Sequence, residues 1–105
     1  MDLGPNEEKQ GNWTLNLLLD NSRYNGKLVI TNQNVYYDIN YNVGGAAGVS
    51  NQDGEIKFSK NDIAQIETFT QYWIFQRFKI TLKNSQQYVF DRGIMPISGI
   101  VKLLQ

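Results

Sequence analysis

The sequence lacks the two side chains on which most catalytic and metal sites depend. Its 105 residues include no histidine and no cysteine. The usual general base near neutral pH, the thiolate nucleophile and the commonest metal ligands are therefore missing, and a nucleophilic triad would need lysine or a carboxylate as its base. The acids other than those near the N-terminus are scattered and form no evident catalytic pair: Asp20, Asp38, Asp53, Glu55, Asp62, Glu67 and Asp91. We expect a non-enzyme with no catalytic residues and no cofactor.

Two loop segments carry residues found in ligand sites, but each lacks an essential part. Residues 51–55 (NQDGE) resemble part of a calcium loop, whose acidic first ligand is replaced by Val49. Residues 44–48 (GGAAG) lack the Gly-Lys-Ser/Thr ending of a phosphate loop. We interpret the first as a turn and the second as a flexible loop tip, and we expect no metal site.

A group of aromatic residues and one arginine predicts a protein contact. In the strand predicted over residues 72–82, Trp73, Phe75 and Arg77 take the face opposite the apolar one. In a simple barrel that face is exposed, and Tyr36 joins it from a neighbouring hairpin. Exposed aromatics near an arginine are typical of interface hot spots. These four residues predict binding of a protein partner or a second copy, unless the N-terminal arm or the C-terminal helix covers them.

The charges balance over the whole chain but not along it. Ten basic and ten acidic residues give a net charge of zero, so no global field favours nucleic acid, which we exclude as a partner. From Gln71 onward, Asp91 is the one acid. The basic residues there, which would form a local basic patch if the late strands share a face, are Arg77, Lys79, Lys83, Arg92 and Lys102.

The elements that would position these residues are mostly β-strands. Period-two alternation of apolar side chains predicts strands over 13–19, 27–31, 35–39, 55–59, 67–70, 72–82 and 87–91. Between them, the apolar spacing of three in residues 61–66 indicates a helical turn or a bulge, capped by Asn61 or Asp62. Exposed edge strands would also allow a partner strand to be added.

The C-terminal segment has a helical pattern. Its apolar side chains lie three or four residues apart, with Pro96 in the predicted first turn, at Ile94, Ile97, Ile100, Val101 and Leu104. Burying each such side chain contributes about 1.5–3 kcal/mol. Six or seven antiparallel strands and one helix pack well as a sandwich or partly open barrel whose end the helix plugs.

Two sequence motifs resemble those of a known family. Residues 26–37 (GKLVITNQNVYY) resemble the "G-x-L-x-I-T-x-x-x-V-x-F" hairpin of GRAM and bacterial pleckstrin-homology-like (PH-like) domains. Residues 56–66 (IKFSKNDIAQI) are similar to their "strand, then D-I-x-x-I" element. The resemblance covers residues 13–105, after a flexible arm at 1–12. It implies a PH-like barrel of six to seven antiparallel strands capped by one C-terminal helix.

The resemblance implies a binding module, used for protein docking or self-association. The alternative is a weak phosphoinositide-binding adaptor at an anionic membrane. Lipid-binding members place several basic residues around the first hairpin, where this chain has Arg23 and Lys27, with Lys57 and Lys60 added if the folded loops converge. A barrel for a small apolar ligand is a second alternative. With no signal-peptide pattern at its start, the chain is expected to be cytoplasmic, peripheral at the inner membrane face if it is an adaptor.

Overall fold

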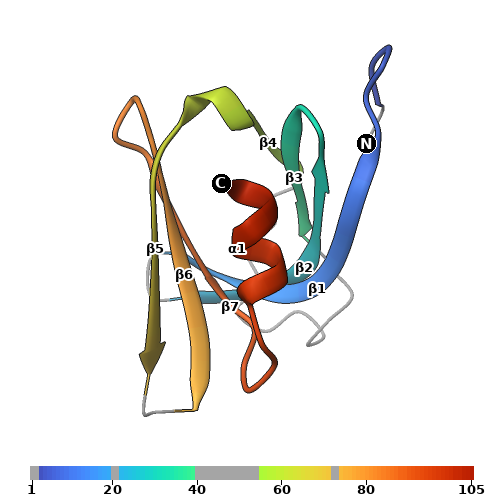
Figure 1. Cartoon of the computed structure of the whole chain (residues 1–105). Helices are drawn as coiled ribbons and strands as arrows, with labels where there is room; N and C mark the ends of the chain where they lie inside the picture. The colour runs from blue at the N-terminus through green and yellow to red at the C-terminus, as the bar shows by residue number, and fades with distance from the viewer. Residues whose placement is uncertain (1–2, 20–21, 40–54, 72–73) are drawn as a thin grey trace.

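The computed structural model describes residues 3–19, 22–39, 55–71 and 74–105. These residues form seven strands, one 3-10 helix and one α-helix (Figure 1). In chain order they are β1 (Lys9–Leu19), β2 (Ser22–Thr31), β3 (Asn34–Ile39), β4 (Glu55–Ser59), η1 (Lys60–Asp62), β5 (Ile63–Gln71), β6 (Phe75–Leu82), β7 (Gln87–Asp91) and α1 (Ser98–Leu104). The predicted mainly-β fold with a C-terminal helix is confirmed. Trp73 and residues 40–54, with nearly all of the two loop segments considered above, lie outside the described residues.

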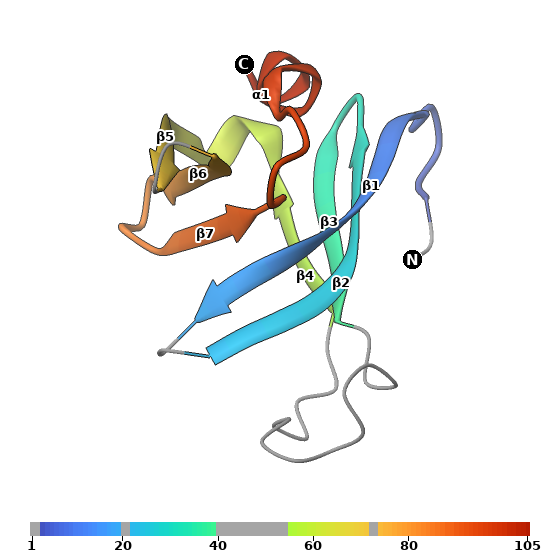
Figure 2. The ribbon, with the colours of Figure 1, turned by 90° about the horizontal axis from the view of Figure 1, so that it is seen from below.

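The strands form one antiparallel sheet that curls around the core. Its order is β4-β3-β2-β1-β7-β6-β5, and β1 joins the two halves because it pairs with β2 along its length and with β7 at Asn16–Leu18. Figure 2 shows β5–β7 on one side of the interior and β2–β4 on the other. β4 and β5 lie at the two ends of the order, so both are edge strands.

The register of the β2–β3 hairpin turns its apolar residues into one core. Leu28 pairs with Tyr37 and Ile30 with Val35, and all four side chains are fully buried, as their alternation predicts. The ring of Tyr37 meets Phe90 edge-on with centroids 5.2 Å apart, and Phe90 stacks on Phe78 at 5.3 Å. These rings join the two halves of the sheet at the centre of the domain.

The first residue of the hairpin motif is glycine because no side chain fits there. A Cβ atom on Gly26 would lie 2.3 Å from the backbone oxygen of Asp38 and 2.7 Å from the ring of Tyr37. The hydroxyl of Tyr37 donates to the backbone oxygen of Leu15 (2.9 Å) or Tyr24 (3.0 Å), which anchors the ring beside the glycine. The β2–β3 pairing therefore depends on the missing side chain.

The second motif forms the connection between β4 and β5. It contains the predicted helical turn, η1, followed by a bulge between Ile63 and Gln65. Its cap is Ser59, whose Oγ accepts from the amide of Asn61 (3.1 Å), so the predicted cap at Asn61 or Asp62 is wrong. After the turn, Ile63 and Ile66 pack against the core.

Helix α1 closes the open mouth between β5 and β3 (Figures 1 and 2). Ile97, Ile100 and Leu104 are buried, as predicted. The prediction for Ile94 is wrong, because its side chain is 72% exposed. Gly93 has a φ of 67°, residues 93–94 form a turn, and the helix begins only at Ser98. Proline disfavours helical backbone at the residue before it, so Pro96 delays the helix instead of opening it.

The N-terminal segment is more ordered than a flexible arm. β1 begins at Lys9. Glu8 is held to the β2–β3 turn because its backbone amide donates to Asn32 Oδ1 (2.8 Å) and its backbone oxygen accepts from the backbone amide of Asn32 (3.0 Å). The expectation of a loose arm through residue 12 is therefore wrong for these residues. Within the described ranges, the chain has no helix with the length and apolar character needed to cross a bilayer.

Candidate functional site

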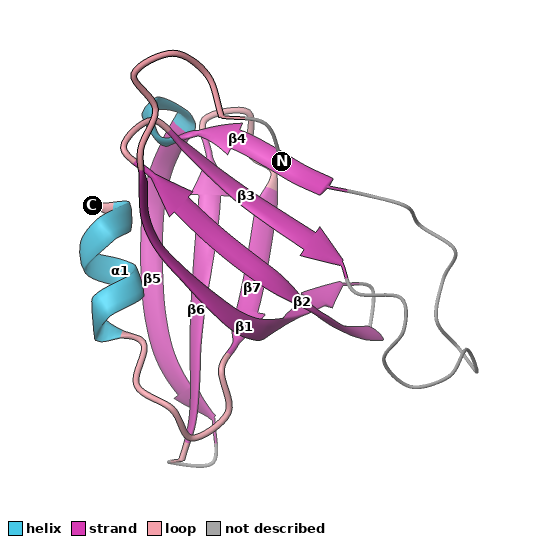
Figure 3. Ribbon diagram, turned by 90° about the vertical axis from the view of Figure 1, so that its right-hand side faces the viewer, coloured by secondary structure: helices cyan, strands magenta, loops and turns pink. Residues whose placement is uncertain are grey.

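A groove lies between the edge strand β5 and helix α1, which are neighbours in Figure 3. Its volume is about 600 Å³. Its described lining residues are Thr68, Phe69, Thr70, Gln76, Ile94, Pro96, Ile97, Ser98, Val101, Lys102 and Gln105. Phe69 and Ile94 are 41% and 72% exposed, so apolar surface is available to a ligand at the rim. The turn that displaces Ile94 from the core places it at this groove.

Tyr36 does not take part in an exposed aromatic surface, so that expectation is wrong. Its side chain is 1% exposed. Its hydroxyl donates to the carboxylate of Glu7, with Oε2 at 2.8 Å and Oε1 at 2.9 Å, and Lys57 Nζ lies 5.4 Å from its ring centroid. The alternative stated above, that the N-terminal segment covers the aromatic residues, is confirmed for Tyr36. Burial and the Glu7 carboxylate raise the pKa of Tyr36.

Glu7 is the centre of this contact. Its carboxylate also accepts from Thr31 Oγ1 (2.5 Å), Asn34 Nδ2 (2.9 Å) and the amide of Gly4 (2.9 Å). The hydrogen bond from Thr31 is the largest influence on its pKa. Burial acts in the opposite direction, and the remaining donors bring the pKa down to about 2. The N-terminal segment is thus fixed over the outer face of β2 and β3 by one ionised carboxylate.

Of the other predicted partner contacts, Phe75 and Arg77 lie together and are partly buried. Trp73 is outside the described residues. Phe75 and Arg77 line a second hollow, of about 460 Å³. Its other described lining residues come from β1, β2 and the end of β7: Thr14, Leu15, Asn16, Arg23, Asn25, Asp91, Arg92 and Gly93. We name this hollow the arginine pocket.

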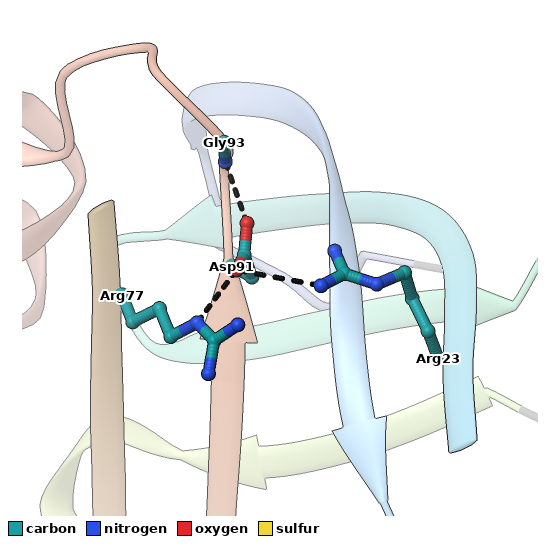
Figure 4. Close-up of polar contacts among 4 residues, drawn as sticks. All are labelled: Arg23, Arg77, Asp91 and Gly93. Atoms are coloured by element: carbon teal, nitrogen blue, oxygen red, sulfur yellow. Dashed lines mark hydrogen bonds and ion pairs between the residues drawn. The ribbon is translucent and has the colours of Figure 1, made fainter. Parts of the chain in front are cut away.

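Asp91 organises the arginine pocket (Figure 4). Its side chain is 1% exposed, and Arg77 and Arg23 approach it from opposite sides. Arg77 Nε donates to Oδ2 at 2.6 Å, the Gly93 amide donates to Oδ1 at 2.6 Å, and Arg23 Nη2 lies 3.7 Å from Oδ2. Burial is the largest influence and raises the pKa of Asp91. The Gly93 amide and the two arginines outweigh it, so the pKa is lower than usual.

The four predicted lipid contacts have different surroundings. Arg23 belongs to the arginine pocket. Lys27 pairs across strands with Asp38 and lines a neighbouring hollow with it. Lys57 covers the ring of Tyr36, and Lys60 Nζ donates to Gln10 Oε1 (2.8 Å). Burial lowers the pKa of Lys60. The structure therefore gives each of these cations a separate setting rather than a common phosphate site.

The centre of the barrel is filled by its own side chains. The contacting rings of Tyr37, Phe78 and Phe90 are fully buried there. Both larger hollows described above open to the surface instead. This packing gives no support to the alternative of a small apolar ligand inside the barrel.

Sequence reasoning missed Glu7, Asp91 and the groove beside β5. Glu7 stands in a polar segment whose composition is typical of loose termini. Asp91 reads as an ordinary acid at a strand end. A signal for its partners did exist, since it is the one acid among the late basic residues, but the position of Arg23 depends on the pairing of β1 with β7.

Comparison with known proteins establishes the fold. No family model and no curated protein sequence matches the chain. Two similar solved structures each give a TM-score of 0.70. The C-terminal domain of an unknown protein from Leishmania infantum is 11% identical, over 93% of this chain and 82% of that one. The hSac2 domain of the human phosphoinositide phosphatase Sac2, a PH-like domain, is 15% identical, over 98% of this chain and 71% of that one. At these identities the likeness concerns the fold, and the chain has a PH-like fold.

Proposed function

We propose that the protein is a non-catalytic docking module that binds an extended segment of a partner protein along β5. The observation that carries this proposal is the groove of about 600 Å³ beside an edge strand, whose mixed lining includes the apolar side chains of Phe69, Ile97 and Val101. An edge strand offers backbone donors and acceptors to an added strand, while an adjacent groove receives alternate side chains of that strand. Strand β5 packs Ile63 and Ile66 against the core and helix α1 buries Ile100 and Leu104 in it, so the groove is formed before the partner arrives.

The lining of the groove indicates the chemistry of the bound segment. Ile97 and Val101 from the C-terminal segment and Phe69 from β5 favour apolar side chains on the partner. Lys102 is the one charged side chain among the described lining residues, so an acidic residue at the α1 side of the segment is favoured. We infer a ligand of extended backbone, with spaced apolar residues and one acid.

The finer family assignment, a GRAM-type domain, rests on the two motifs at residues 26–37 and 56–66. Their roles support it, because Gly26 permits the hairpin and Ile63 and Ile66 reach the core. The membrane adaptor has weaker support, since the four cations proposed for it lie in different surroundings. Location in the cytoplasm remains a prediction from the sequence.

A peptide-display selection against the whole chain tests the docking proposal. We expect enriched peptides to have alternating apolar residues and an acid, and to shift the amide resonances of Thr68–Thr70 and of α1. Phe69→Ala should weaken binding about tenfold, the usual effect of truncating a hot spot. Ile74→Ala is the matched control, because Ile74 is 53% exposed and does not line the groove.

Backbone pairing has its own control. A selected peptide with N-methyl groups on the amides that face β5 should lose binding, because it cannot donate to the edge strand. Equal affinity of the Phe69 and Ile74 variants, or binding that tolerates N-methylation on every residue, would refute the proposal. A dimer that forms without peptide and dissociates on Phe69→Ala would show a second copy in the groove instead.

A further inference from the structure

The arginine pocket combines a surplus of positive charge with a hollow large enough for a small molecule. Arg23, Arg77 and Arg92 line it, and Asp91 is the one acid in its described lining. Among the described lining residues, guanidinium groups therefore outnumber carboxylates. The charge-neutral whole chain conceals this local surplus.

Two of the arginines are only partly engaged by the described residues. Arg23 is 50% exposed, and its distance of 3.7 Å from Asp91 exceeds an ordinary hydrogen bond. Arg92 donates through Nη1 to the backbone oxygen of Pro96, and the described part of the chain places no carboxylate within ion-pair distance of it. Arg77, in contrast, is fixed by its 2.6 Å hydrogen bond to Asp91. Arg23 and Arg92 therefore retain donors for a ligand.

The pocket is held in shape by main-chain contacts. The Gln76 amide donates to the Gly93 oxygen (2.6 Å), and the Arg92 amide donates to the Gln76 oxygen (3.0 Å), so the turn after β7 is attached to the start of β6. Gly93 accepts a φ of 67° in that turn, and its amide is directed at Asp91. A preformed wall of this kind reduces the cost of ordering a ligand.

We propose that the arginine pocket binds a phosphate monoester of a sugar or polyol. Planar guanidinium groups match phosphate oxygens in pairs, and the positive charges of Arg23 and Arg92 match a dianion. A volume of about 460 Å³ exceeds the needs of a bare phosphate and falls in the range of small-molecule sites. Thr14, Asn16 and Asn25 provide hydrogen-bonding groups for hydroxyls, and Phe75 provides an apolar wall.

This pocket is separate from the groove between β5 and α1, here called the docking groove, although Arg92 donates to the backbone oxygen of Pro96 at the groove. The two hollows have no lining residue in common. Successive residues of β6 face opposite sides, so Gln76 lines the groove whereas Phe75 and Arg77 line the arginine pocket. A phosphate ligand and a bound peptide segment can thus be tested separately.

The test is titration of the whole chain with glucose 6-phosphate, inorganic phosphate and glucose. Binding is measured by calorimetry and by the NMR signals of the arginine Nε–H groups. We expect saturable binding of glucose 6-phosphate, weaker binding of phosphate and none of glucose. Arg23→Gln and Arg92→Gln should each lower the affinity for glucose 6-phosphate about tenfold or more. Lys83→Gln, which removes the same charge just after the far end of β6 at Leu82, should leave this affinity unchanged.

Absence of saturable binding at millimolar glucose 6-phosphate would overturn the proposal and leave the arginines as partners of Asp91 alone. Equal losses in the Arg23, Arg92 and Lys83 variants would overturn it too, because they would indicate a diffuse charge effect. Vesicles of phosphatidylcholine with and without phosphatidylinositol 4-phosphate form the second arm. Binding to the phosphorylated vesicles that glucose 6-phosphate displaces supports the pocket with a headgroup as its source. Vesicle binding without any glucose 6-phosphate binding overturns it.

Discussion

Replacing Gly26 by alanine should destabilise the domain far more than one methyl group normally does. The added Cβ would lie 2.3 Å from the Asp38 oxygen, 2.7 Å from Tyr37 Cζ and 2.8 Å from its hydroxyl. Ordinary contact requires about 3.5 Å, so β2 and β3 would have to separate by about 1 Å. The neighbouring atoms are backbone and a fully buried ring, neither of which can rotate out of the way.

The expected cost combines two effects. Overpacking in a core typically costs about 1–3 kcal/mol. Displacement of Tyr37 would also strain the hydrogen bond from its hydroxyl to Leu15 or Tyr24, which adds about 1 kcal/mol. We therefore expect a loss of about 3 kcal/mol, equivalent to a fall in Tm of about 12 °C or more for a domain of this size.

Urea unfolding, monitored by circular dichroism, gives the free energy of unfolding for Gly26→Ala and for a matched control. Gly99→Ala is the control, because no atom lies within 4 Å of the added Cβ and Gly99 is in α1. The helix preference of alanine should stabilise that variant by about 0.5–1 kcal/mol. If Gly26→Ala stays within about 1 kcal/mol of the unchanged protein, the close approach of β2 and β3 is not what the structure indicates.

Three further results are expected. Ile100→Ala should cost about 2–5 kcal/mol in unfolding free energy, whereas Ile94→Ala should cost less than about 0.5 kcal/mol, because the first side chain is buried and the second is 72% exposed; similar losses in urea titrations would contradict the helix position. Glu7 has a pKa of about 2 against an ordinary 4.5, so its stabilising contribution is present above pH 4.5 and is lost as pH falls toward 2. Glu7→Gln should therefore lower Tm at neutral pH and make the decline of Tm in acid less steep. A variant with the same decline of Tm in acid would argue against the carboxylate contact. The Lys79–Glu67 pair (3.4 Å) is partly exposed, so Glu67→Gln should change stability by less than about 1 kcal/mol, and by still less in high salt.

The strands were predictable because each has one side in the core. Alternation at Leu28, Ile30, Val35 and Tyr37 identified the β2–β3 hairpin and its inward face correctly. Period two carries this information whenever one face of a strand is buried. It gives no information about what covers the other face, which is why Tyr36 was expected to be exposed and is instead buried by Glu7.

The helix boundary shows the limit of spacing alone. Ile94 and Ile97 are three residues apart, as in a helical stripe, and Pro96 is acceptable in a first turn. The same sequence also fits a turn, because Gly93 adopts positive φ and proline restricts Met95. The tertiary position of Ile97, which must reach the core, decides between them. The result is a shorter helix and an exposed Ile94 at the mouth of the docking groove.

The candidate sites were less predictable than the fold because they depend on distant pairings. Arg23 was assigned to lipid binding and Arg77 to partner binding, yet both lie beside Asp91 in the arginine pocket. The pairing of Asn16 with Asp91 brings the two halves of the sheet together there, and no local pattern in either strand encodes it. Nearby cations help a buried carboxylate to remain ionised. Asp91 accordingly lies beside Arg23 and Arg77, which are far apart in the sequence. The resulting cluster has more cations than Asp91 requires, and that excess is the physical reason to expect an anionic ligand.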